Sequence, residues 1–382
     1  MINIRLSFLL LLIFILALHV FTVYFSYQFN FINAVRFDYV LLYAFDSLLM
    51  AMVLFLIFFQ FRSRFIYFNQ NLDLDGYLYS IRFFILIAFV FLAYKALGSI
   101  LAIISGARRE DLVLGEGAVT GIDTAIFSFF IVLIFTFYAY FGKRLYVTLL
   151  LFLGVVLSMS IGASRSELIS IALLYIILCG FFGFWEKKWT LILGSITILA
   201  AAVMVTIFLQ NRPIAEGFSG FYYIVESFFK YRTYSLFLAE HAITAADTFE
   251  KILYPFLGYL IERPFAYLSP TVPIDSNFVT QYHYLGEYKP HHPMLANVLY
   301  PWWAWFYGAF GVVGLFLKAL FSYLVFFFLL KNRLFFSFFI FVLLFVVSGA
   351  VKHPFLTLGG VVSVIICIFF DIGYRRFKNR VA

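Results

Sequence analysis

Residues 288–314 read YKPHHPMLANVLYPWWAWFYGAFGVVG, and within this stretch a polar segment gives way to an apolar one. The polar part ends a long interlude, residues 210–296, in a chain otherwise made of apolar runs. It holds His241, His283, His291 and His292. A segment outside the hydrocarbon can gather titratable groups, whereas lipid-facing segments lack water and tolerate few charges. We therefore expect the chemistry of this protein in or beside this loop.

The composition is typical of a polytopic membrane protein. Of 382 residues, 64% are hydrophobic and 12% are charged, and the mean hydropathy is +1.01, which excludes a soluble protein with separate core and surface. The net charge of +8 fits positive loops on the cytoplasmic side, and no basic run is dense enough to bind nucleic acid. Cys179 and Cys367 lie in apolar runs without metal-ligand spacing.

Runs of spanning length predict an all-α fold of about ten transmembrane helices with one large outer loop. This layout divides the chain into an N-terminal bundle of about seven helices (1–209), an outer loop with interfacial helices (210–296), and a re-entrant segment followed by about three helices (297–382). The expected spans are residues 7–25, 39–59, 81–104, 122–141, 145–161, 168–185, 190–209, 308–330, 334–348 and 356–372.

The distribution of Lys and Arg predicts the orientation. With the N-terminus inside, the cytoplasmic ends receive most of these residues, whereas the short outer loops receive few. We therefore expect a multi-pass membrane protein with both termini cytoplasmic and the long loop outside; the resemblance described below implies that the membrane is the bacterial inner membrane, which makes the outer side periplasmic. The inner set is Arg5, Arg62, Arg64, Arg82, Lys143, Arg144, Lys187, Lys188, Lys331, Arg333, Arg375, Arg376, Lys378 and Arg380.

The long loop divides into two halves. Residues 220–260 favour a helix lying on the membrane surface, because Glu226 and Lys230 form an i, i+4 pair and aromatic residues recur on one side. The second half is rich in proline, and we expect an irregular loop packed on the scaffold. After it, Trp302, Trp303 and Trp305 indicate an interfacial or re-entrant segment before the next span.

The hairpin LSMSIGASRSELIS, residues 157–170, joins two spans at the outer interface. Its small residues allow close approach of a ligand, and the guanidinium of Arg165 offers a fork of donors suited to phosphate oxygens. The alternative is an arginine that snorkels at a helix end and pairs with Glu167.

This hairpin, the large outer loop and the loop exit from Asn297 to Gly314 resemble the oligosaccharide repeat-unit polymerases (Wzy, O-antigen polymerase type) and, more distantly, the O-antigen ligases. The resemblance implies a GT-C-like fold and transfer of a glycan from undecaprenyl pyrophosphate to a sugar hydroxyl at the outer face of the inner membrane. It implies neither a cofactor nor a metal. The partners would be the lipid-linked oligosaccharide and membrane lipid, with room for a chain-length regulator. By that likeness Arg165 holds the donor pyrophosphate and Asn297 belongs to the substrate-binding set.

The reaction itself needs cations and a base. Departure of a lipid pyrophosphate builds negative charge, which Arg165, Arg212, Arg232 and Arg263 could stabilise. Histidine suits removal of the acceptor proton near neutral pH, and His291 and His292 stand just before the chain re-enters the membrane. The alternative is a pair of solvated loop histidines. A metal on this pair lacks a well-spaced third ligand, since Glu287 lies in an irregular loop.

Asp46 and Lys95 lie deep within predicted spans. They could meet at similar depth, either as an ion pair that locks two helices or as the polar lining of a path for the lipid phosphate. Lys318 is a similar case with no obvious partner.

The rival from another class is a flippase that moves a lipid-linked sugar without making bonds. Such a transporter would show paired halves and polar residues along a path between leaflets, whereas this chain shows no repeat and gathers its polar residues on one side. Walker A, G-x-G-x-x-G, HExxH and G-x-S-x-G patterns are absent from the sequence, so nucleotide-driven, zincin and α/β-hydrolase chemistry have no support.

Overall fold

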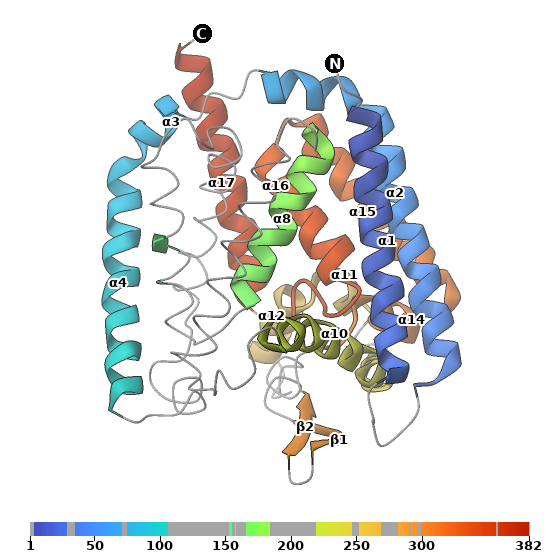
Figure 1. Ribbon diagram of the computed structural model, residues 1–382. Helices are drawn as coiled ribbons and strands as arrows, with labels where there is room; N and C mark the ends of the chain where they lie inside the picture. Colours follow the sequence, from blue (N-terminus) through green and yellow to red (C-terminus); the bar gives the residue numbers. More distant parts are fainter. Residues whose placement is uncertain are drawn as a thin grey trace.

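A computed structural model describes residues 4–28, 35–70, 75–105, 153–154, 157, 166–183, 219–246, 252–268, 282–289, 292–296, 299–356 and 358–381 (Figure 1). This part of the chain is mostly helical. Its elements are α1 (Ile4–Gln28), α2 (Phe37–Gln70), α3 (Asp75–Ser80), α4 (Arg82–Ile104), α8 (Ser166–Phe182), α10 (Ser219–Ala246), α11 (Tyr254–Leu257), α12 (Tyr259–Leu268), β1 (His283–Lys289), β2 (His292–Ala296), α14 (Trp302–Phe310), α15 (Val312–Lys331), α16 (Phe335–Val342), the π-helix η4 (Leu343–Ser348) and α17 (Leu358–Val381).

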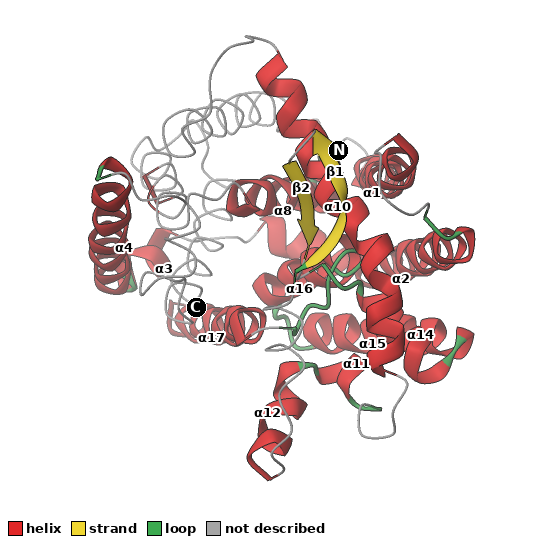
Figure 2. Ribbon diagram, turned by 90° about the horizontal axis from the view of Figure 1, so that it is seen from below, coloured by secondary structure: helices red, strands yellow, loops and turns green. Residues whose placement is uncertain are grey.

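Several helices run side by side, and α10 lies across their ends (Figure 1). Helix α1 packs on α2, α8 and α10, and α15 packs on α2, α14 and α16. The β1–β2 hairpin projects beyond α10, while both chain termini lie at the opposite end of the bundle. We call the end that carries α10 and the hairpin the hairpin end. Viewed from that end, α4 stands apart from the other described helices except α3 (Figure 2).

Four of the described helices are long and apolar enough to cross a membrane: α1, α2 up to Phe68, α4 up to Ala102, and α15. Shorter apolar helical stretches cover Ala172–Phe182 and Phe335–Ser348. These elements confirm the helical, membrane-type character that the composition predicted. The predicted spans at residues 122–141 and 190–209 lie outside the described residues, and of the span at 145–161 only 153, 154 and 157 are described, so the total of ten remains a prediction.

The core is built from phenylalanine. The Phe8 ring of α1 stacks on Phe58 of α2 with centroids 3.9 Å apart. Phe181 of α8 meets Phe65 at 4.9 Å and Phe338 of α16 at 5.4 Å. Each of these side chains is buried. Edge-to-face and offset contacts of this kind add to the burial of large apolar surfaces, so they fix α8 and α16 against the α1–α2 pair.

Polar side chains secure the ends of two helices in this bundle. Asp371 of α17 is buried and accepts hydrogen bonds from the backbone N–H groups of Phe336 and Ser337 at 3.0 and 2.7 Å, where α16 begins. At the end of α15, Arg64 donates to the carbonyl oxygens of Leu330 and Lys331 at 2.6 and 3.0 Å. Both side chains satisfy backbone groups that a helix leaves open at its termini.

The tryptophan segment is buried inside the protein, and its expected interfacial or re-entrant position in the membrane stays a prediction. Trp302, Trp303 and Trp305 are all fully buried in α14, and the Trp302 indole N–H donates to the Pro255 carbonyl at 2.6 Å. Gly311, with φ of 59°, turns the chain between α14 and α15. A short helix does precede the long one, as predicted, but its indoles pack within the protein, where Trp302 also finds a backbone acceptor.

The second half of the long loop is more regular than its prolines predicted. After α10, which forms as a helix as expected, the chain builds α11, α12 and the antiparallel hairpin β1–β2. The register pairs His283 with Ala296 at the open end and Lys289 with His292 near the turn. Gly286, with φ of 130°, lies at a register shift in β1. Such irregular pairing escapes a search for alternating apolar residues.

Candidate functional site

Arg232 is the one predicted site residue whose side chain the structure describes. It lies on α10, is 5% exposed, and reaches α1 and η4 together. Its Nε donates to Thr22 Oγ1 at 3.1 Å, and its two terminal nitrogens point at the Val347 carbonyl at 3.3 and 3.4 Å. Within the described part of the chain, no carboxylate pairs with this guanidinium. A buried cation that meets only neutral oxygen atoms is costly unless another group compensates it.

The Val347 carbonyl that faces Arg232 lies at the end of the π-helix η4, where the N–H of Val351 donates to the Ser348 carbonyl instead. In an α-helix, each interior carbonyl is engaged by the N–H four residues on. Residues Leu343–Ser348 instead adopt the wider π geometry, and Val347 lies near the end of this segment. π-Helical turns within helices often occur at functional sites, and here the irregular turn meets the arginine from the crossing helix.

A histidine and a tyrosine extend the polar cluster around Arg232. His19 of α1 is 4% exposed, and its Nδ1 lies 2.7 Å from the Tyr43 hydroxyl of α2. The same hydroxyl faces Thr22 and Arg232. His19 also lies within electrostatic reach of Arg232 and Lys318. Thr22 follows His19 by about one helical turn, so α1 presents both polar side chains to the same place.

The two intramembrane charges pair differently from the expectation. Lys318 of α15, which had no predicted partner, places its Nζ 2.6 and 2.7 Å from the two carboxylate oxygens of Asp46. Both side chains are buried, at 0% and 2% exposed. The predicted partner Lys95 lies on α4, where its ammonium group is 5.9 Å from the Phe91 ring. The structure therefore joins α2 to α15, and the Asp46–Lys95 pairing is wrong.

Counting charges over this cluster gives an excess of positive charge. Arg232 and Lys318 are cationic, while Asp46 supplies the carboxylate that Lys318 already holds. Of the described residues in the cluster, none offers Arg232 a negative charge. A guanidinium carries five N–H donors in a fixed fork that matches carboxylate and phosphate oxygens. The arrangement is therefore suited to receive an anion.

The other predicted site residues are not brought together by the described part of the structure. Arg165, Arg212, His291 and Asn297 lie outside the described residues. Arg263 belongs to α12 and His292 to β2, and the positions of their side chains are not described. The grouping of these residues with Arg232 thus stays a prediction.

His353 is a structural histidine. It is 1% exposed, its Nε2 lies 3.1 and 3.2 Å from the carbonyls of Tyr254 and Pro255, and its Nδ1 accepts the Phe355 N–H at 3.0 Å. Nε2 must therefore carry the proton of a neutral ring. Burial lowers the pKa of His353 to about 3, although the two backbone carbonyls favour the charged form. This histidine ties the 351–356 turn to α11.

The structure also brings together two histidines that the sequence gave no reason to pair. His241 of α10 and His283 of β1 stack with ring centroids 4.0 Å apart and planes inclined by 31°. Tyr300 meets His283 edge-on at 6.2 Å. The sequence signal was only their presence in one loop, because contacts between residues far apart in the chain leave no periodic pattern.

Comparison with known proteins identifies no family for this chain, because no family model, curated protein or solved structure matches it.

Proposed function

We propose that this chain is a membrane glycosyltransferase that polymerises undecaprenyl-pyrophosphate-linked oligosaccharide repeat units into O-antigen or capsule-type polysaccharide, at the outer face of the bacterial inner membrane. The observation that carries the proposal is the buried Arg232 guanidinium, which has only neutral acceptors among the described residues. The pyrophosphate of the lipid donor is the anion that this site would receive.

The contacts of Arg232 suggest how an anion could replace them. Its present donor–acceptor distances, 3.1 to 3.4 Å, are longer than the about 2.7–2.9 Å of a charge-assisted bond between a guanidinium and an anionic oxygen. A phosphate oxygen would therefore compete well with the Thr22 hydroxyl and the Val347 carbonyl. Because the site is buried, the electrostatic gain would also be larger than in water.

The transfer step needs two further actions. The acceptor sugar hydroxyl attacks the anomeric carbon of the lipid-linked glycan, the bond from that carbon to the pyrophosphate oxygen breaks, and the lipid pyrophosphate leaves with the electron pair. Arg232, together with Arg165, Arg212 and Arg263, would stabilise the leaving group. A loop histidine, His291 or His292, would take the proton of the acceptor hydroxyl.

The test uses the purified chain in detergent with the undecaprenyl pyrophosphate that carries the native repeat unit, and reads the product as a glycan ladder on a gel. We expect Arg232→Gln to lower the polymerisation rate by about 10²–10³-fold, as removal of one oxyanion-stabilising donor typically does. Arg232→Lys should recover part of the rate, since it keeps the charge but loses the fork. Arg165→Ala should also lose the ladder.

Arg36→Gln is the matched control, because Arg36 is an exposed arginine near α10 that pairs with Asp38 at 2.7 Å. Its ladder should match the parent, and gel filtration should show each variant to be monodisperse. If the well-folded parent makes no ladder from its native donor, the polymerase proposal fails. Transfer of a preformed glycan to a different acceptor would then favour a ligase, and lipid translocation without transfer would favour a flippase.

A further inference from the structure

The β1–β2 hairpin has one face toward the protein and one toward solvent. On β1, Leu285 is buried and His283 is partly buried, whereas the alternate Tyr284 and the preceding Tyr282 are 49% and 57% exposed. An isolated two-stranded hairpin is at best marginally stable in water. The position of this hairpin therefore depends on the few side chains of its inward face.

His283 makes the aromatic contact that joins this face to α10. Its ring stacks on His241 with centroids 4.0 Å apart, and Tyr300 packs against it edge-on. The buried Nε2 of His283 has no hydrogen-bond partner within the described part of the chain. The contact is thus a stack of two imidazoles rather than a hydrogen-bonded pair.

The groups that face this stack do not neutralise a proton on it. On α10, Glu240 points toward Arg36 at 3.6 Å, and Arg36 also binds Asp38 at the start of α2. Tyr300, from the segment before α14, is a phenol whose pKa is raised by burial, so it stays neutral. Opposite His283 on β2 stands Ala296. Burial, followed by the neighbouring His241, lowers the pKa of His283.

We infer that His241 and His283 are positioning residues: the contact between their rings holds the hairpin, and with it His292, against α10, and protonation of His283 releases it. The role given to His292 rests on the proposed function, whereas the release itself does not. A charged His283 would lie partly buried with its ring 4.0 Å from that of His241, and the described residues around it provide no carboxylate to offset the cost.

The direction of the pH dependence follows from linkage. In the docked hairpin the pKa of His283 is below its ordinary value of about 6.5. Between the lowered pKa and the ordinary pKa, the released hairpin therefore binds more protons than the docked hairpin. Docking is therefore fully favoured above about pH 6.5 and is lost as the pH falls through that range.

Hydrogen–deuterium exchange of the full chain in detergent tests the release without any substrate. Exchange is measured at pH 8 and pH 5.5, with labelling times scaled so that intrinsic amide exchange is equal. We expect peptides covering 282–296 to lose protection by about fivefold or more at pH 5.5. Peptides from α15 and α16 should keep theirs.

Three variants make the test specific. His241→Gln and His283→Gln should each remove the pH step from the hairpin peptides. His241→Lys, which carries a permanent charge beside His283, should release the hairpin already at pH 8. His292→Gln is the control on the same hairpin, because His292 pairs with Lys289 near the turn whereas His283 pairs with Ala296 at the open end, and it should keep the step.

A parent hairpin with equal protection at both pH values would overturn the inference, as would a pH step that survives in both His241→Gln and His283→Gln. In the ladder assay, the acid limb of the pH–rate profile should move to lower pH in His241→Gln. A pH step in exchange without any glycan ladder would support the pH-dependent docking of the hairpin and reject the polymerase proposal. A ladder without a pH step in exchange would support the polymerase proposal and reject the pH-dependent docking.

Discussion

At the scale of single residues, Asp46 and Lys318 form a buried ion pair between two helices of the described structure. Their charged atoms meet at 2.6 Å with almost no exposed surface, and Lys318 Nζ also lies 5.0 Å from the Trp302 ring. Replacing a buried ion pair by apolar residues is often neutral, whereas removing one partner leaves an unpaired buried charge. The pair therefore serves first as a lock between α2 and α15.

Asp46→Asn should destabilise the protein by about 3–5 kcal/mol, because Lys318 is left without its counter-charge. The measurement is thermal unfolding in detergent, together with the amount of protein in membranes. The double variant Asp46→Leu with Lys318→Met should recover most of the loss, since no charge remains buried. If Asp46→Asn is as stable as the parent but inactive, the pair lines the substrate path instead and the lock is wrong.

His353 makes the stability of the protein depend on pH. Its folded-state pKa of about 3 lies below the unfolded value, so the unfolded chain binds more protons in the window between them. Its contribution is present above about pH 6.5 and is lost as the pH falls toward 3, at up to about 1.4 kcal/mol per pH unit. Unfolding curves at pH 8, 6.5 and 5 should show a falling midpoint.

The comparison variant is His353→Gln. It should start from a lower midpoint at pH 8, since it loses the ring packing and one of the backbone hydrogen bonds, but it should vary less with pH. Parallel slopes for parent and variant would show that other groups cause the acid sensitivity.

At the scale of elements, α10 and α14 approach each other through a glycine. A Cβ on Gly308 would lie 2.9 Å from both the Cα of Ile243 and the Cβ of Ala246, which is closer than side-chain atoms pack. Gly308→Ala should therefore destabilise the protein by about 1–3 kcal/mol, despite the better helix propensity of alanine.

Gly98→Ala is the matched control for this change. Gly98 lies within α4 with open space around its hypothetical Cβ, so alanine there should be neutral or stabilise by up to about 1 kcal/mol. Equal melting temperatures for the two variants would refute the close packing of α10 on α14.

Element positions could be predicted from the sequence where one apolar run makes one helix. The expected spans at 7–25, 81–104 and 308–330 match α1, α4 and α15 to within a few residues. Helix α2 continues beyond its predicted end at residue 59 to Gln70, and Arg64 in this extension donates to carbonyls at the end of α15. The hairpin and the interior position of α14 could not be predicted, since both depend on partners distant in the chain.

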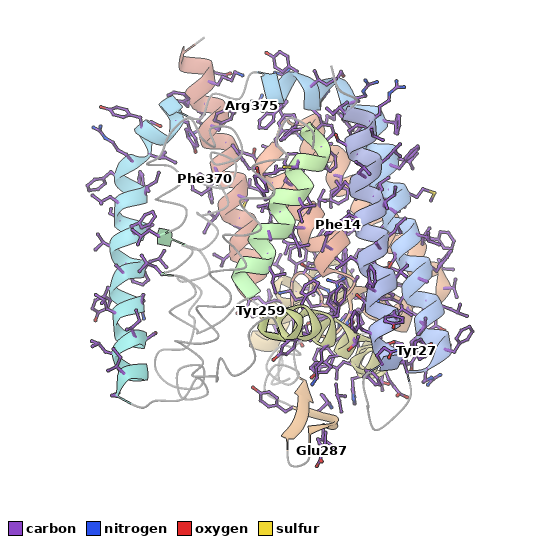
Figure 3. All side chains as sticks on the ribbon, viewed as in Figure 1. Phe14, Tyr27, Tyr259, Glu287, Phe370 and Arg375 are labelled. Atoms are coloured by element: carbon purple, nitrogen blue, oxygen red, sulfur yellow. The ribbon has the colours of Figure 1, made fainter. Side chains whose placement is uncertain are left out.

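At the scale of the whole molecule, the hairpin and the termini occupy opposite ends. Glu287 lies on the hairpin and Arg375 lies near the other end of the bundle (Figure 3). If the bundle crosses the membrane as we expect, these positions face opposite compartments. Cys179 and Cys367 are both buried, so they should react little with a reagent that labels introduced cysteines.

In inner-membrane preparations of defined orientation, Glu287→Cys should react with a membrane-impermeant maleimide added from the periplasmic side, and Arg375→Cys should react only after the membrane is permeabilised. Labelling of both cysteines from the same side would reject the predicted topology. Unlabelled parent protein serves as the control for the native cysteines.

The candidate site was partly predictable for the same physical reason. Charge in an apolar chain is rare enough to be noticed, so Arg232, Asp46 and Lys318 could be singled out from the sequence. The partners of Arg232 could not be singled out, because Thr22, Val347 and Tyr43 are common residues whose roles come from how α10 crosses the bundle. The contact between His241 and His283 could not be predicted for the same reason, because it too depends on the position of α10.

The burial of α14 gives the molecule a spectroscopic property. Three of the five tryptophans of the chain lie in this short helix, and these three are fully shielded from solvent. Their fluorescence should be blue-shifted, and that of Trp302 should sense the electric field of the Lys318 ammonium beside its ring. Any event that moves α10 or disturbs the Asp46–Lys318 pair would then change the emission, so that unlabelled protein could report binding of the proposed donor lipid.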